Sequence, residues 1–126
     1  MSKKKQSGKL SKRGEKAAAR YLELQGYKIL DRNWSCPAGE VDIVAREGDV
    51  LVFVTVKTRA GISRGFPGEE ASPSVRSRNE KVAAYYLSEF RDVDFPVRFD
   101  TVSLLVVAED RALIRHYVNA FGNGCC

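Results

Sequence analysis

Apolar residues recur at three- and four-residue steps near the start of the chain, up to Leu22, and Gly26 follows as a stop signal. This spacing predicts an amphipathic helix over residues 11–25, with Ser11 as its N-cap. Glu15 lies at the border of the apolar stripe of this helix. Its carboxylate could therefore reach the rim of a site on a neighbouring sheet.

Later segments alternate between apolar and polar residues or are continuously apolar, which predicts five strands. We expect these strands at residues 27–34, 40–46, 50–57, 97–107 and 112–118. A second helix is expected from Ser72-Pro73, with Ala83, Tyr86, Leu87 and Phe90 as its buried stripe. The third strand is apolar on both faces from Val50 to Val54, so it should lie in the centre of the sheet. The expected order, αβββαββ, is that of a single α/β domain.

Gly65, Pro67 and Gly68 mark a loop over residues 59–71 between the third strand and the second helix. A long loop at this place is typically mobile and well placed to contact a ligand.

The second and third strands form a predicted hairpin, whose register decides which polar side chains meet. A turn at Gly48-Asp49 pairs Ile43 with Val54 on a face shared by Val41, Ile43 and Ala45. The other face then pairs Asp42 with Thr55 and Glu40 with Lys57. A turn at Glu47-Gly48 would shift these pairs while keeping the two faces.

Two interpretations of this polar hairpin end remain open. Glu40 and Lys57 could form an ordinary cross-strand ion pair, which needs no function and contributes about 0 to 1 kcal/mol. Alternatively, the carboxylates could hold Mg²⁺, which often takes only one or two protein carboxylates and completes its shell with water and phosphate oxygens. Lys57 could then assist an attacking water at a phosphodiester.

Composition and charge narrow the class of protein. The chain has 126 residues, of which 44% are hydrophobic and 29% charged, as in an ordinary globular domain. Its apolar runs are too short to cross a bilayer, and no apolar segment follows the first lysines, so we expect a cytoplasmic protein without a membrane partner. The three cysteines, Cys36, Cys125 and Cys126, fit a reduced state.

The net charge of +5 is concentrated in two places. Residues 1–13 carry bases and no acid, which predicts a basic, flexible arm in front of a domain over residues 14–126. Such an arm either binds polyanions or only solubilises the chain. A second basic group accompanies Lys57 and is the better candidate for a nucleic-acid-binding surface. Its members are Arg59, Arg64, Arg76, Arg78 and Lys81.

Three further positions are more simply explained by structure than by chemistry. His116, the single histidine, is expected to be structural on the last strand. Asp100 is expected in a local ion pair or hydrogen bond, and Tyr27 and Trp34 in the core.

The blocks that carry the most specific information are Gly14-Glu15, Gly39–Val44, Leu51–Val54, Val56–Arg59 and Arg98–Asp100. With these blocks the chain resembles the YraN-type family of bacterial proteins, along nearly its whole length after the basic arm. That family is similar to the restriction-endonuclease-like PD-(D/E)XK superfamily, which includes Holliday-junction resolvases. The resemblance implies an αβββαβ core in which helices flank a mixed sheet.

The resemblance also implies a divalent-metal site at the kink of the second and third strands. Asp42 would be the metal-binding aspartate, Lys57 the catalytic lysine and Glu15 the acid of the first helix, with the Val56 carbonyl as a further ligand. Mg²⁺ or Mn²⁺ would be the cofactor and nucleic acid, most simply DNA, the partner. A homodimer is compatible with this reading.

Thr55 is the main departure, because the family motif expects glutamate or aspartate there. A hydroxyl is a neutral, weak metal ligand, so about one unit of negative charge is missing. Glu40 could substitute for the missing acid. The sequence therefore predicts a nucleic-acid-binding protein that is a metal-dependent DNA endonuclease with a degenerate motif. A non-catalytic nucleic-acid-binding module and a protein-interaction domain remain as alternatives.

Overall fold

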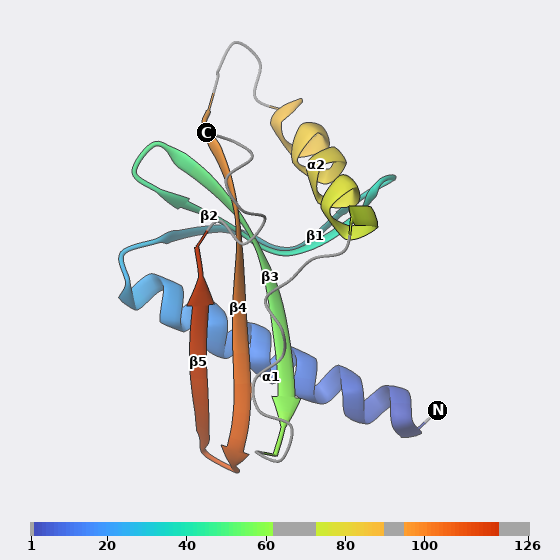
Figure 1. Cartoon of the computed structure of the whole chain (residues 1–126), viewed down its shortest axis with the longest axis vertical. Helices are drawn as coiled ribbons and strands as arrows, with labels where there is room; N and C mark the ends of the chain where they lie inside the picture. The colour runs from blue at the N-terminus through green and yellow to red at the C-terminus, as the bar shows by residue number, and fades with distance from the viewer. Residues whose placement is uncertain (1, 62–72, 90–94, 119–126) are drawn as a thin grey trace.

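The computed structural model of the chain describes residues 2–61, 73–89 and 95–118. Within these residues the order of elements is αβββαββ, as predicted (Figure 1). The elements are α1 (Ser2–Leu24), β1 (Lys28–Cys36), β2 (Gly39–Glu47), β3 (Val50–Ala60), α2 (Pro73–Leu87), β4 (Val97–Ala108) and β5 (Arg111–Tyr117). None of the described helices is both long and apolar enough to span a membrane.

The five strands form one mixed sheet in the order β1-β2-β3-β4-β5. Neighbouring strands are antiparallel except β3 and β4, which run parallel because the chain crosses over through α2 between them. β3 is central, as its apolar run predicts. The arrangement confirms the α/β class and is consistent with an αβββαβ core.

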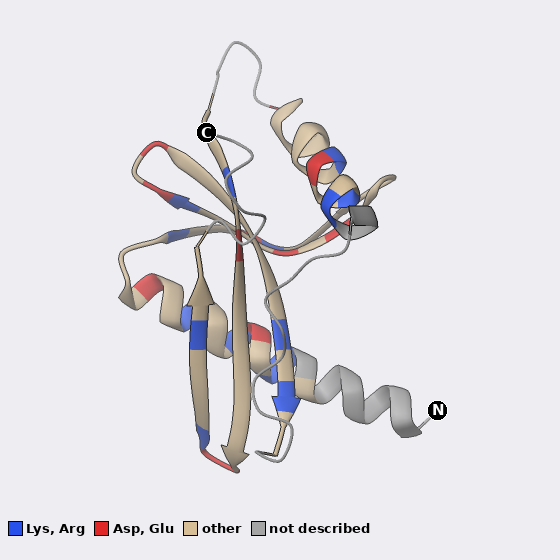
Figure 2. Cartoon of the chain, in the orientation of Figure 1, with Lys and Arg blue, Asp and Glu red and all other residues tan. Residues whose placement is uncertain are grey.

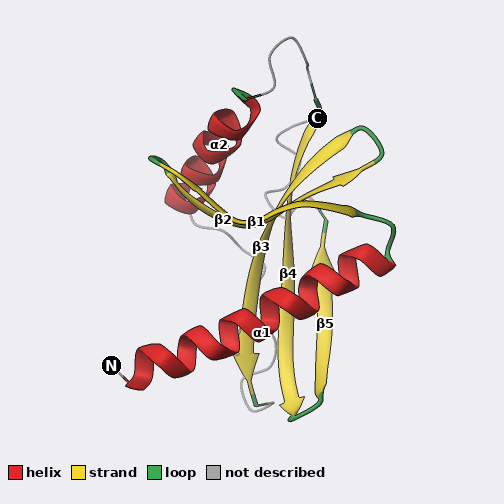
Figure 3. Ribbon diagram, turned by 180° about the vertical axis from the view of Figure 1, so that it is seen from behind, coloured by secondary structure: helices red, strands yellow, loops and turns green. Residues whose placement is uncertain are grey.

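The two helices pack on opposite faces of the sheet (Figures 1 and 3). α1 buries Ala18 and Leu22 in a cluster with Ile43, Val54 and Leu104, among other residues. The second cluster lies under α2 and is built from Val82, Ala83, Tyr86, Val44, Leu51 and Phe53 with their neighbours. The apolar stripes of both helices are therefore satisfied by one sheet.

The ends of two elements differ from the prediction. α1 begins at Ser2, so Ser11 lies inside the helix and is not its N-cap. The basic residues 2–13 are continuous with this helix, and their separate role as an arm stays a prediction. β3 continues to Ala60 because its parallel pairing with β4 extends to Ala60–Val106, so the expected loop cannot begin at residue 59.

Several predicted features lie outside the described residues. They are the remainder of the 59–71 loop from residue 62, with Arg64, Gly65, Pro67 and Gly68, and also Phe90, Cys125 and Cys126. Cys36, which is described, is a free thiol as expected.

A buried charge cluster ties β4 to β5. The Asp100 side chain is fully buried and accepts hydrogen bonds from Arg98 Nε and Nη2 at 2.9 Å each. His116 Nε2 lies 2.7 Å from Asp100 Oδ2, the oxygen that also accepts from Arg98 Nη2. Tyr27 and Trp34 pack in the two clusters, so the structural interpretations of these residues are confirmed.

Candidate functional site

The β2–β3 hairpin opens into a fork at the residues that the sequence singles out. Its register is the preferred one, with Ile43 opposite Val54, and this is the last ladder pair towards the fork. Beyond it, Asp42 Oδ2 accepts a hydrogen bond from the Val56 amide at 2.8 Å. A side-chain carboxylate thus takes the place of a backbone carbonyl, and the strands separate instead of pairing Asp42 with Thr55 across the ladder.

The fork also changes which way β2 presents its side chains. Val41 was expected on the face of Ile43 and Ala45, but it packs with Val44 in the cluster under α2. Ile43 and Ala45 pack in the cluster under α1. The alternation is broken at Asp42, because its carboxylate is directed towards the backbone of β3 and not to either face.

α1 brings a second carboxylate to the fork. Glu15 is only 8% exposed, and its charge acts on Asp42. The preceding residue, Gly14, lies so close to β3 that a methyl group there would be 3.0 Å from Thr58 Cβ and would overlap Thr58 Oγ1. Because Gly14 has no side chain, α1 can lie close to β3, and this position of the helix determines how near Glu15 lies to the fork. A glycine inside a helical pattern was the available signal for this role, which the sequence analysis missed.

The pKa of Asp42 is affected by its burial and by the neighbouring acids. Burial raises the pKa of Asp42 from 3.8 to about 6. The hydrogen bond from the Val56 amide opposes this shift, whereas the charges of Glu15 and Glu40 add to it. The charges of Glu15 and Glu40 therefore act on Asp42, and a cation at the fork would relieve this repulsion.

α2 contributes Arg78 to the same end of the sheet. Its charge lowers the pKa of Asp42, and its stem packs on Gly39, where a Cβ atom would lie 2.8 Å from Arg78 Cδ. Gly39 also has a φ of 147°, so a side chain at this position would be both strained and obstructed. Among the other predicted basic residues, Arg59 is half-buried on β3, and Arg76 and Lys81 are exposed on α2.

Lys57 and Thr55 lie on the sheet face that α2 partly covers. Even-numbered positions of β3, such as Val54 and Thr58, pack towards α1, so Thr55 and Lys57 alternate to the opposite face with Phe53. Both are half-buried. Glu15 therefore approaches the fork from the α1 side and Lys57 from the α2 side, with Asp42 between the strands.

The oxygen atoms at the fork fit a divalent cation that takes most of its ligands from water and substrate phosphate. Among the described residues no group of three or more His, Cys, Asp or Glu side chains could hold a metal ion. Asp42 and Glu15 remain as two hard oxygen donors whose charges interact, next to the Val56 amide. Mg²⁺ is often held by one or two carboxylates together with water and substrate phosphate, and this pair meets that lower requirement.

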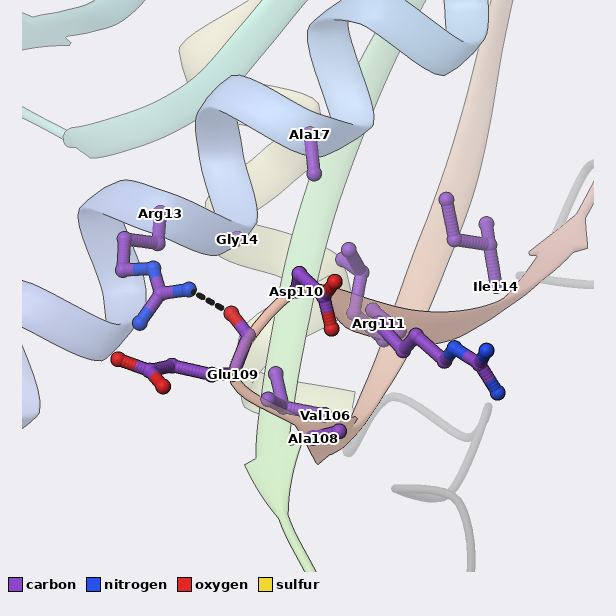
Figure 4. Close-up of a pocket in the computed structure, with 11 residues that line it drawn as sticks. Arg13, Gly14, Ala17, Val106, Ala108, Glu109, Asp110, Arg111 and Ile114 are labelled. Carbon is purple, nitrogen blue, oxygen red and sulfur yellow. Dashed lines mark hydrogen bonds between the residues drawn. The ribbon is translucent and has the colours of Figure 1, made fainter.

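A cavity of about 330 Å³ lies away from the fork, between α1 and the β4–β5 turn (Figure 4). Apolar residues such as Ala17, Val106 and Ile114 line it, and Arg13 Nη2 donates a 2.6 Å hydrogen bond to the Glu109 carbonyl at its rim. Neither Asp42 nor Lys57 is among its lining residues. This cavity and the predicted chemistry are therefore separate features.

Comparisons with known proteins identify the family of the chain. A family model described as "Uncharacterised protein family UPF0102" matches residues 14–104. UPF0102 is the YraN-type family that the sequence resembles, and it lies in the restriction-endonuclease-like superfamily.

Individual relatives match over most of their length. A UPF0102 protein of Beutenbergia cavernae is 42% identical over 82% of this chain and 87% of its own. A UPF0102 protein of Geobacter sulfurreducens is 43% identical over 89% and 88%, and one of Pelotomaculum thermopropionicum is 42% identical over 89% and 94%.

Proposed function

We propose that this chain, which belongs to protein family UPF0102, binds nucleic acid at the β2–β3 fork and cleaves it as a metal-dependent endonuclease. The observation that carries the proposal is the half-buried Asp42, whose carboxylate is held at the fork by the Val56 amide and is acted on by the charge of Glu15. A carboxylate pair that repels itself in the folded protein is stabilised by a divalent cation.

Asp42 and Glu15 are the residues that would hold Mg²⁺ or Mn²⁺, with the Val56 carbonyl beside them. When bound, the ion supplies Lewis-acid polarisation of a phosphate oxygen. The protein's own groups do the rest. Lys57 on β3 orients the attacking water or neutralises charge on the phosphate, and Arg78 offsets the negative charge of the fork.

The expected reaction is the addition of water across one P–O bond of a phosphodiester. Nicked, branched and single-stranded DNA are the substrates to test, each with Mg²⁺ and with Mn²⁺. Cleavage should disappear in Asp42→Asn and Lys57→Ala, and it should persist in Arg46→Gln, a control at the exposed turn end of β2. No cleavage of any substrate with either metal would refute the endonuclease proposal.

A second candidate function is a non-catalytic nucleic-acid-binding module in the cytoplasm. Thr55 at the motif position supports it, as does the small number of metal-ligating side chains at the fork. This candidate predicts salt-dependent DNA binding without cleavage. Binding that does not weaken as salt rises would count against both candidates and favour a protein-interaction domain.

A further inference from the structure

Strand β5 forms one edge of the sheet, and its outer side is open among the described residues. β4 is its neighbour in the strand order, and the turn and loop hydrogen bonds of the described chain do not reach β5. An edge strand presents a row of N–H and C=O groups with which another strand can pair. The outer side of β5 is therefore a candidate surface for such pairing.

The pairing of β3, β4 and β5 shows which backbone groups of this edge point outwards. Gly61 N donates a 2.9 Å hydrogen bond to the Val106 carbonyl, so Val106 directs its backbone groups towards β3. Successive residues of a strand alternate in this direction, so Leu105 directs its groups towards β5 and bonds with its ladder partner Leu113. On β5 the residues between such bonded positions therefore direct their N–H and C=O groups away from the sheet. They are Ala112, Ile114 and His116.

We propose that a second copy of this chain pairs with this edge, β5 against β5, about a two-fold axis at Ile114. The inference goes beyond the proposed function and does not depend on metal binding at the fork. Antiparallel pairing about this axis places Ile114 opposite the same residue of the second copy, and Ala112 opposite the second copy's His116. Every outward-directed residue then meets another one, and the pairs together exchange about six hydrogen bonds.

The charges of β5 favour this register over its neighbours. Figure 2 shows basic and no acidic residues on β5. An axis at Leu113 would place Arg111 opposite the second copy's Arg115, and an axis at Arg115 would place this residue opposite itself. Like charges that are directly opposed destabilise a sheet. About Ile114 the two arginines lie opposite Tyr117 and Leu113 instead, so the edge is complementary to itself.

The same axis accounts for exposed apolar side chains near this edge. Leu113 is 50% exposed, and the aliphatic part of the second copy's Arg115 can cover it. α1 passes β5 where the Tyr21 hydroxyl lies 3.5 Å from His116 Nδ1, and its last residue, Leu24, is 75% exposed. In Figures 1 and 3 this end of α1 reaches past β5.

The overhanging end of α1 and the cavity beside β5 are brought together by this pairing. His116 lies opposite the second copy's Ala112, and Ala112 lines the cavity of about 330 Å³ between α1 and the β4–β5 turn. The end of α1 that passes His116 therefore lies over the second copy's strand, on the side of its cavity. Each copy thus brings its exposed Leu24 towards an apolar hollow of the other, which Ala17 and Ile114 also line.

Sedimentation equilibrium of the full-length protein over a range of concentrations tests the pairing. The wild type should reach the mass of two chains. Ala112→Pro removes an outward N–H at an exposed position and leaves the β4–β5 ladder intact, and the axis doubles the loss to two hydrogen bonds. The dissociation constant of the dimer should rise about tenfold or more. Tyr85→Gln, which changes an exposed aromatic residue on α2, should dimerise as wild type.

Disulfide formation gives a second test that needs no disruptive substitution. In a background with Cys36, Cys125 and Cys126 replaced by serine, Ile114→Cys faces its own copy across the axis at a Cα distance of about 5.5 Å, which suits a disulfide. Leu113→Cys is at a more exposed position but lies about 8 Å from its symmetry mate, which is too far. Mild oxidation should therefore cross-link only Ile114→Cys, as seen on a non-reducing gel.

A wild-type protein that stays monomeric at every concentration would overturn the proposal and leave the edge to an extended peptide from another protein. A dimer that Ala112→Pro leaves intact, and in which Leu113→Cys cross-links as readily as Ile114→Cys, would also overturn it. Neither result would bear on metal binding or cleavage at the fork.

Discussion

Replacing Gly14 by alanine tests how α1 is positioned against the fork. In a helix interior, glycine is about 1 kcal/mol less favourable than alanine, so propensity alone predicts stabilisation. The structure predicts the opposite sign. The added methyl group would overlap Thr58 Oγ1 and would lie 3.0 Å from Thr58 Cβ and 3.2 Å from Cγ2. Rotating the threonine side chain only exchanges one obstructing atom for another, so the helix must move.

Overpacking of this kind typically costs about 1 to 3 kcal/mol, and a contact this short belongs at the upper end. After the gain from propensity, we expect Gly14→Ala to lose about 1 to 2 kcal/mol of unfolding free energy. Because Glu15 follows Gly14, the shift also moves Glu15 away from Asp42. The pKa of Asp42 should then decrease from about 6 towards 3.8.

Urea denaturation gives the free energy, and NMR titration of the side-chain carboxyl carbon gives the pKa of Asp42. Lys16→Ala, an exposed neighbour on the same helix, is the matched control and should be nearly neutral. Adding Thr58→Ala to Gly14→Ala should restore part of the lost unfolding free energy, with a coupling energy between the two substitutions of at least about 1 kcal/mol. Stabilisation of Gly14→Ala by about 1 kcal/mol, with an unchanged Asp42 pKa, would refute this reasoning.

Three further predictions concern charge. Arg98→Met removes the guanidinium that binds the buried Asp100 carboxylate, and it should lower the free energy of unfolding, measured by urea denaturation, by about 3 to 5 kcal/mol. Glu47→Gln removes only the exposed ion pair between Arg98 and Glu47, and it should lower the same free energy by about 0 to 1 kcal/mol. The pKa of Asp42 is about 6 in the folded protein and about 3.8 in the unfolded chain, so the folded state binds this proton more tightly. The wild type therefore loses stability as the pH rises from about 3.8 to about 6. Asp42→Asn should therefore be more stable than wild type at pH 7, by up to about 3 kcal/mol, and equal to it below about pH 4; equal stabilities at both pH values would contradict this. Thr55→Glu should tighten Mn²⁺ binding in calorimetry and Thr55→Gln should not, and destabilisation without tighter binding would remove residue 55 from the site.

The fold was largely predictable because residues close together in the sequence determine its helices, strands and hairpin turn. The period of apolar residues gave the order of the elements, and the Gly48-Asp49 turn gave the register of Ile43 with Val54. A tight turn and two matched faces leave few alternatives for a hairpin.

The break at Asp42 was not predictable in the same way. Alternation assumes that the ladder continues, but the Asp42 carboxylate binds the Val56 amide and replaces a backbone partner. Val41 then turns to the face of α2. Aspartate competes well for backbone donors, although its sequence neighbours do not show when it will do so.

Contacts between distant elements were predicted only in outline. His116 and Asp100 were each expected to be structural, but their 2.7 Å contact depends on the pairing of β4 with β5. The approach of Glu15 to Asp42 likewise depends on Gly14 packing against Thr58. Such contacts are set by the tertiary fold and not by the spacing of residues along one element.

The central claim is that the carboxylates at the fork bind a divalent cation, and isothermal titration calorimetry with Mn²⁺ tests it most directly. At pH 7.5, where Asp42 is ionised, the wild-type protein should bind one equivalent, and Asp42→Asn should lose most of the affinity. Glu23→Gln, an exposed acid on the same helix as Glu15, should bind as wild type. Equal binding by wild type and Asp42→Asn, or no binding by the wild type, would contradict the account.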